Sequence, residues 1–327
     1  MPTEYEIAHS QKYDGLFQAT FRSMGCDIEM WVAAHDGIAA VGALEQATAF
    51  ILAADQLMSR FRPDSELARL NARAGQRTSV SSQLYEVIVA ALAAARDSDG
   101  LCDPTLLNSL VAAGYDRTFA DVQRAQHQSS ELAVPYPGRW REVSIEPATS
   151  SITIPEGVGL DLGGIGKAWA AQKASETLSL VGPCVVNAGG DIAVSGELHP
   201  GEGWPVAIRD PHHPERHLMT FEIKGGGIAT SGTDGRRWMR AGFPQHHIID
   251  PRSGFVADTD VLTATVISRD ILTSERLALA AVVLGSVEGF AYLTRHRGSA
   301  GVIVTRDARV ITTPSIRSHK LVGDAAT

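Results

Sequence analysis

Glycines gather at a predicted junction between a strand and a helix near the middle of this 327-residue chain. The apolar run 158–162 predicts a strand, residues 163–167 read Gly-Gly-Ile-Gly-Lys, and residues 168–180 have helical spacing. Glycine lets a backbone approach a ligand, and a helix N-terminus offers N–H groups to an anion. The junction therefore predicts a nucleotide-phosphate site in which Lys167 adds a full charge. Because the spacing matches neither the dinucleotide fingerprint nor the P-loop, a tight turn with a surface lysine is the alternative.

The order of the predicted elements indicates the fold class. Helices dominate the early part of the chain and strands the later part, which is typical of an α+β protein rather than a repeating βαβ fold. We predict helices at 37–58, around 67–71, at 81–94, up to about 113, and at 168–180, 273–284 and 286–296. We predict two strands within 17–32 and others at 143–145, 152–154, 158–162, 184–187, 192–195, 205–209, 217–223, 227–231, 246–249, 261–267, 302–304 and 310–311. The expected core is a mixed, largely antiparallel sheet with flanking helices.

The remaining segments suggest a simple domain organisation. We expect residues 1–15 to be an N-terminal tail and residues 16–327 to form one domain. The polar and patternless stretch 117–139 predicts a long surface loop.

Composition excludes several classes of function. A net charge of −8 argues against nucleic-acid binding, which requires a basic face. The three cysteines are far apart and odd in number, so they predict neither a metal site nor a disulfide framework but a reducing compartment. No apolar run approaches the ~18 residues of a membrane span, and the N-terminus lacks a signal-peptide apolar region. We expect a cytoplasmic protein without membrane insertion; its oligomeric state does not follow from the sequence.

Polar side chains also stand beside glycine or proline in four other segments. Residues 246–254 place a His, an Asp and an Arg around a turn, and His can move a proton near neutral pH, although a polar hairpin has the same pattern. Residues 187–191 and 232–237 either bring backbone against a flat ligand or pack strands closely. Residues 103–105 either belong to a site or cap a helix. The adjacent histidines do not predict a metal site, because neighbours on a strand face opposite ways.

Seven segments, taken in order, resemble the ApbE family, the FAD:protein FMN transferases. They are Met24-Gly25; Met58-Ser59 through Ser65, with Asn71; Asp103-Pro104-Thr105, with Cys102 where the family has Phe; Asp161 to Lys167; Gly189-Gly190-Asp191; Ala229 to Gly232; and His247 to Gly254, with Ser253 where the family has Thr. The matches cover about residues 24–285, and their order makes the resemblance specific.

The resemblance implies the fold of that family and an FAD substrate. It implies transfer of FMN from FAD to a Ser or Thr hydroxyl of an acceptor protein, with release of AMP. His247 would be the general base on that hydroxyl, or would orient it. The residues expected to bind FAD are Met24, Phe61, Cys102, Asp103, Pro104, Thr105, Gly163, Lys167, Trp169 and Ile248, with the ring of Phe61 or Trp169 stacked on a ring of FAD.

The implied Mg²⁺ site departs from the family pattern. The family holds the ion with an Asp and a Thr four residues apart on one helix and with a main-chain carbonyl. These positions are Glu275, Leu279 and Gly166 here. Glu275 can still ligate a hard cation, whereas Leu279 cannot. Two rival functions therefore stay open: an FAD pyrophosphatase with water as acceptor, and a non-catalytic flavin-binding protein, which Leu279 favours.

Overall fold

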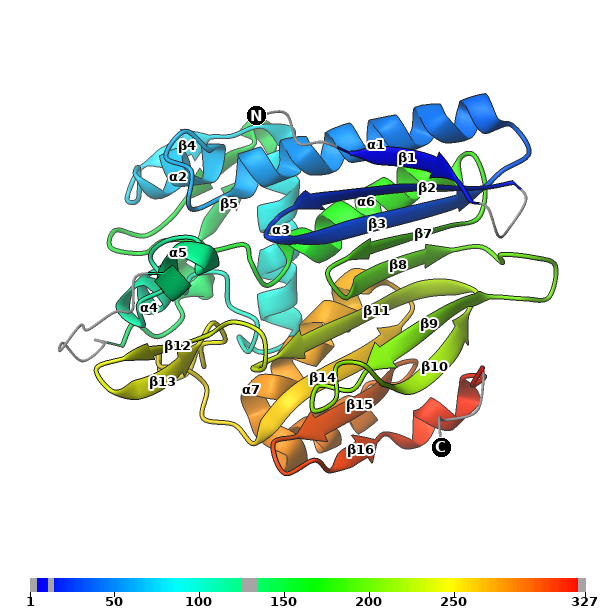
Figure 1. The fold of residues 1–327 in the computed structure, drawn as a ribbon. Helices are drawn as coiled ribbons and strands as arrows, with labels where there is room; N and C mark the ends of the chain where they lie inside the picture. The colour runs from blue at the N-terminus through cyan, green and yellow to red at the C-terminus, as the bar shows by residue number, and fades with distance from the viewer. Residues whose placement is uncertain (1–4, 11–14, 125–134, 323–327) are drawn as a thin grey trace.

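A nine-stranded sheet runs through the protein (Figure 1), whose computed structural model describes residues 5–10, 15–124 and 135–322. Its strand order is β1-β2-β3-β7-β8-β11-β14-β15-β16, and neighbouring strands are antiparallel throughout. The strands are β1 Glu6–His9, β2 Leu16–Ser23, β3 Cys26–Ala33, β7 Cys184–Ala188, β8 Asp191–Ser195, β11 Gly225–Gly232, β14 Val261–Ser268, β15 Ala300–Thr305 and β16 Val310–Thr312. Segments from both ends of the chain therefore share one sheet.

Three long helices cover one face of this sheet. They are α1 Gly37–Met58, α6 Gly166–Ser179 and α7 Ile271–Arg295. Helix α1 packs on α6, α6 packs on β7 and β8, and α7 packs on β11 and β14. The other helices are α2 Glu66–Asn71, α3 Ser82–Asp97, α4 Leu107–Ala112 and α5 Phe119–Arg124. Helices α2, α4 and α5 gather beyond one end of the strands (Figure 1), together with small sheets made of β4 Arg77–Ser79, β5 Ser144–Glu146 and β6 Ser151–Thr153, and of β12 Arg237–Arg240 and β13 Phe243–His246.

A hairpin of β9 Trp204–Arg209 and β10 His217–Ile223 covers the opposite face of the sheet. Successive residues of a strand point to opposite faces. Val186 accordingly belongs to the core under the helices, while Val185 packs with Trp204 and Phe221 of the hairpin. Strand β14 is buried at every position because both of its faces are covered.

Polar side chains cap the starts of three helices. Asp36 accepts hydrogen bonds from the N–H groups at the start of α1, which spans the predicted 37–58. Ser65 and Ser81 cap α2 and α3 in the same way. Helix α7 changes direction at Gly285, where φ is 81°, and this change separates the two predicted helices 273–284 and 286–296.

Several predictions differ from the structure. The α+β class is confirmed, but the described sheets contain antiparallel pairs rather than a mixture. Residues 6–9 of the predicted tail form β1, which pairs with β2. The predicted loop 117–139 contains α5, and residues 125–134 lie outside the described part. The predicted strand 246–249 was wrong beyond His246, where β13 ends. The predicted strand 158–162 was also wrong, because a side chain rather than a neighbouring strand binds its backbone.

Two described helices, α1 and α7, are long and apolar enough to cross a membrane by length and composition alone. In this fold α1 packs on α6, and α7 packs on the sheet. Core helices pass the same test, so the finding does not identify a membrane span.

Candidate active site

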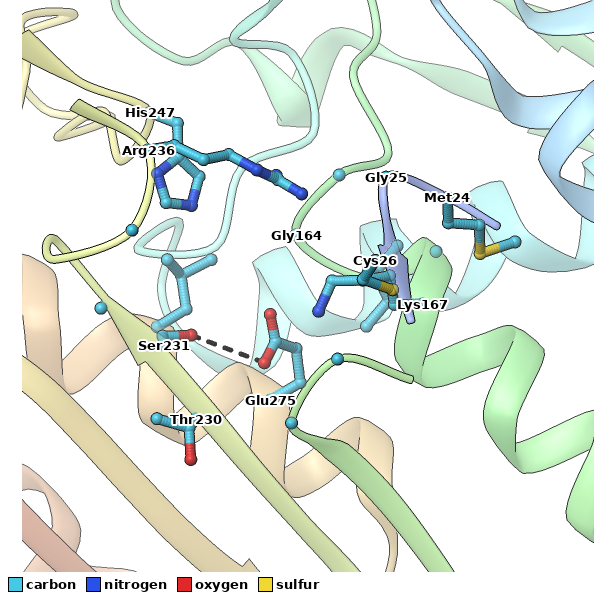
Figure 2. Close-up of a pocket in the computed structure, with 18 of the residues that line it drawn as sticks. Met24, Gly25, Cys26, Gly164, Lys167, Thr230, Ser231, Arg236, His247 and Glu275 are labelled. Carbon is cyan, nitrogen blue, oxygen red and sulfur yellow. Dashed lines mark hydrogen bonds between the residues drawn. The ribbon is translucent and has the colours of Figure 1, made fainter. Parts of the chain in front are cut away.

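A cavity of about 1330 Å³ opens beside the glycine-rich junction. Its wall includes the turn between β2 and β3, the turn between β7 and β8, the junction 161–167 and the segment 247–249 (Figure 2). Small-molecule sites usually have volumes of roughly 300–1,000 Å³. The cavity therefore has room for a ligand as large as a dinucleotide.

The glycine-rich junction forms a tight turn directly before α6, which begins at Gly166. Side chains crowd the turn, since a Cβ on Gly163 would lie 2.9 Å from Oδ1 of Asp161 and one on Gly164 would lie 3.2 Å from the side chain of Leu279. Oδ1 of Asp161 accepts the Gly163 N–H at 2.9 Å. Among the described residues, no side chain caps the start of α6. The helix N-terminus therefore borders the cavity in a form that suits an anion.

Lys167 is paired rather than free in the cavity. Its ammonium contacts Asp191, whose side chain is 1% exposed. Burial lowers the pKa of Lys167, but attraction to Asp191 and Glu275 outweighs burial and raises that pKa above its ordinary value. Burial, followed by repulsion from Asp191, raises the pKa of Glu275 to about 8. Since Asp191 offsets the charge of Lys167, this lysine alone does not provide the net positive charge that the sequence predicted.

The two adjacent histidines occupy different environments. His246 is buried, and its Nε2 lies 3.1 Å from the carbonyl oxygen of Ala257. His247 lines the cavity beside Arg236 (Figure 2). Burial, together with the positive charge of Arg236, lowers the pKa of His247 to about 3. The His247 imidazole is therefore neutral near pH 7 and able to accept a proton.

Most residues predicted to bind FAD line this cavity, namely Met24, Phe61, Cys102, Asp103, Pro104, Gly163, Lys167 and Ile248. Thr105 supports the site from behind, because its hydroxyl donates to Asp103 and accepts the N–H of Arg139. Trp169 is only 2% exposed and lies in the core, with its ring centroid 5.4 Å from that of Phe50. Of the two rings predicted to stack on FAD, Phe61 lines the cavity and Trp169 does not, because the first turn of α6 directs the Trp169 side chain toward α1.

Sequence reasoning missed several residues of the cavity wall. The guanidinium carbon of Arg60 lies 4.1 Å from the ring centre of Phe61 and 4.5 Å from that of Tyr115. The Asp55 carboxylate accepts the Met24 N–H at 3.0 Å and helps to hold Met24 at a φ of 51°. A carboxylate in the last turns of a largely apolar helix was a signal for Asp55. Tyr115 lies in a stretch without a periodic pattern, and no sequence signal marks it.

The residues predicted to hold Mg²⁺ do not fit this ion. Glu275 is buried, and Oε2 lies 3.5 Å from the Ser231 hydroxyl (Figure 2). Leu279 presents an apolar side chain to the cavity that Gly166 also lines. Within residues 5–10, 15–124 and 135–322, no three His, Cys, Asp or Glu side chains are placed to share a metal ion. Mg²⁺ requires near-octahedral oxygen ligands, and two neighbouring carboxylates, Glu275 and an Asp191 already paired with the Lys167 ammonium, do not provide them.

Comparisons with known proteins agree with this geometry. The model of the ApbE family matches residues 24–304. The FAD:protein FMN transferase of Treponema pallidum (strain Nichols) is 30% identical over 304 residues, which cover 86% of this chain and 82% of that protein. The ApbE protein of Thermotoga maritima MSB8 superposes with a TM-score of 0.80 at 21% identity, over 93% of this chain and 98% of that one. The flavin transferase ApbE from Vibrio cholerae superposes with a TM-score of 0.73 at 21% identity, over 98% of this chain and 100% of that one. The extent of the family match and the shared fold lead to the conclusion that this chain belongs to the ApbE family.

Proposed function

We propose that this protein transfers FMN from FAD to a Ser or Thr hydroxyl of an acceptor protein and releases AMP. The observation that carries the proposal is the position of the His247 imidazole in the wall of a cavity large enough for FAD. The relatives from Treponema pallidum and Klebsiella pneumoniae are named FAD:protein FMN transferase, which supports the same activity.

In this reaction the acceptor hydroxyl gives its proton to the His247 imidazole as its oxygen attacks the phosphorus of the FMN moiety. The bond from that phosphorus to the bridging oxygen breaks, and AMP leaves with the bond's electron pair. The imidazolium then passes its proton to AMP or to solvent. A bound diphosphate raises the pKa of His247 from its low value in the free protein, because a nearby anion favours the imidazolium. This shift brings the base toward the neutral range in which general bases are most effective.

The cavity wall divides into a part suited to phosphate and a part suited to a planar ring. Backbone of the junction 163–166 borders one side, and the helix N-terminus there suits the diphosphate. The rings of Phe61 and Tyr115, with centroids 5.6 Å apart, also line the cavity and offer apolar surface to a flavin or adenine ring. We therefore assign Lys167 to holding the junction in place through Asp191, in addition to its contact with the ligand.

No step of this reaction passes through Mg²⁺, because the residues present do not fit it. We therefore expect the rate of transfer to be unchanged by added Mg²⁺ and by EDTA, and a loss of transfer in EDTA would contradict this. A second candidate function is a flavin-binding protein without catalysis. The observation that favours this alternative is Leu279 in the cavity wall, where the family has a Thr.

Denaturing gels test the proposal, because covalently bound flavin stays on the acceptor and fluoresces. The protein is incubated with FAD and a soluble extract of cells that lack it, and free FMN and AMP are measured by chromatography. We expect a fluorescent acceptor band with the wild type and none with His247→Ala. Free FMN with AMP and no band supports a pyrophosphatase. FAD that stays bound and unchanged supports the flavin-binding alternative, and either outcome overturns the proposal.

We also propose a cytoplasmic location. All three cysteines, Cys26, Cys102 and Cys184, are free thiols. A reducing compartment keeps such thiols unpaired. Cell fractionation with immunodetection tests this location, and recovery of the protein outside the cytoplasmic fraction would refute it.

A further inference from the structure

Almost every basic side chain in the cavity wall has a carboxylate partner. The pairs are Arg22 with Asp27, Arg60 with Asp161, Arg62 with Asp64, Lys167 with Asp191 and Arg209 with Asp234. Among the lysines and arginines of the wall that the structure describes, Arg236 is the exception, with no ion pair or side-chain hydrogen bond. The cavity therefore contains one strong cation whose charge no neighbouring carboxylate offsets.

The position of Arg236 makes this charge available to a ligand. The residue is half-buried on the loop between β11 and β12, and its guanidinium projects into the cavity toward Lys167 and Gly164 (Figure 2). Its Nη2 lies 3.7 Å from the point where a Cβ on Gly25 would stand. The guanidinium thus faces the glycine-rich junction across the cavity, next to the turn between β2 and β3.

We propose that Arg236 binds a phosphoryl group of the flavin nucleotide, opposite the N-terminus of α6; this assignment rests on the proposed function. The fork of N–H donors on a guanidinium matches the oxygens of a phosphate and forms short, charge-assisted hydrogen bonds. Lys167 cannot fill this role alone, because Asp191 already offsets its charge. The residues around Glu275 do not fit a divalent cation either. Arg236 therefore supplies a positive charge that no carboxylate already holds, next to the junction where a diphosphate would lie.

The same position places Arg236 beside the reacting group. Burial is the largest cause of the low pKa of His247, and the charge of Arg236 is the second. This effect of Arg236 requires that the two side chains lie close together. A phosphoryl group on Arg236 would lie within reach of the His247 imidazole. Arg236 is thus an anion-binding residue that also aligns the phosphorus with the base.

Arg236→Gln tests the assignment, with Arg237→Gln as a matched control. Arg237 is the next residue in the chain and has the same charge, but it is exposed and lies outside the cavity wall. FAD, FMN and riboflavin are titrated into each variant, and quenching of flavin fluorescence gives the dissociation constant. We expect Arg236→Gln to raise the dissociation constant for FAD about tenfold or more. Loss of a hydrogen bond to a charged group changes a dissociation constant by about this factor. Arg236→Lys should recover part of the loss, and Arg237→Gln should leave FAD affinity unchanged.

The riboflavin arm separates a phosphate contact from a general loss of structure, because riboflavin has no phosphate. We expect Arg236→Gln and wild type to bind riboflavin equally and to unfold at the same temperature. Equal FAD affinity in Arg236→Gln and wild type overturns the assignment and leaves the proposed function standing. An equal loss of riboflavin affinity also overturns it, because the residue would then act through the fold. If the wild type binds no FAD, the proposed function and this assignment both fail.

Discussion

The side chain of Asn71 holds the segment that leads into the glycine-rich junction, and removing it should weaken both the fold and the site. Its Nδ2 donates to the carbonyl oxygen of Leu160 at 2.9 Å, and its Oδ1 accepts the Leu160 N–H at 2.8 Å. Leu160 is 0% exposed, so water cannot easily replace the amide after Asn71→Ala. A buried polar group left unpaired costs about 1–3 kcal/mol, so two such groups cost roughly 2–6 kcal/mol. Because Asn71 itself is partly exposed, we expect the low end of that range.

Urea unfolding followed by tryptophan fluorescence measures this loss. Asn108→Ala is the control, since it removes an exposed hydrogen bond of 2.7 Å to Gly157 on the same segment. We expect the control to lose less than about 1 kcal/mol. FAD affinity should fall only with Asn71→Ala, because Asp161 follows Leu160 directly. Equal losses of stability in the two variants would refute the reasoning.

Three further predictions concern the cavity and its histidines. His247→Ala should slow FMN transfer by about 10²-fold or more while keeping FAD affinity, and an unchanged rate would remove His247 from the mechanism. Burial lowers the pKa of His246 to about 4, below its unfolded value of about 6.5, so the unfolded state binds more protons as the pH falls through this window. The free energy of unfolding should therefore fall by up to about 1.4 kcal/mol per pH unit between about pH 6.5 and pH 4. In His246→Gln the free energy of unfolding should depend less steeply on pH over this range, and equal slopes in the variant and the wild type would contradict this. Leu279→Thr should strengthen Mn²⁺ binding, measured by electron paramagnetic resonance, because it adds an oxygen near Glu275; identical binding curves would exclude a latent metal site.

Local signals in the sequence were sufficient for most of the fold. The caps Asp36, Ser65 and Ser81 act on N–H groups within a few residues, so the helix starts could be predicted from neighbouring residues. Gly285 likewise marks the change of direction in α7. The segment 158–162 has the composition of a strand, but its backbone binds Asn71. No local pattern reveals a partner 89 residues away, which is why this strand was predicted wrongly.

The parts of the candidate site that lie in sequence motifs could be predicted. Roles that depend on which side chains a residue contacts in the fold could not. The order of the motifs identified the junction and His247. The sequence could not show that Asp191 offsets Lys167, since this pairing depends on how β8 lies beside α6. It also could not show that Arg236, rather than the adjacent Arg237, faces the cavity. Trp169 was misassigned because an aromatic residue beside a glycine turn suits a core as well as a ligand.

The distribution of products from FAD tests the central claim most directly. The protein is mixed with FAD and with the acceptor that the fluorescent gel band identifies, purified without flavin, and AMP, free FMN and acceptor-bound FMN are followed together by chromatography and mass spectrometry. Transfer to a hydroxyl predicts that AMP and acceptor-bound FMN appear in equal amounts, on a Ser or Thr, with no free FMN. Free FMN that equals AMP, at a rate independent of the acceptor, would contradict the account and identify water as the acceptor.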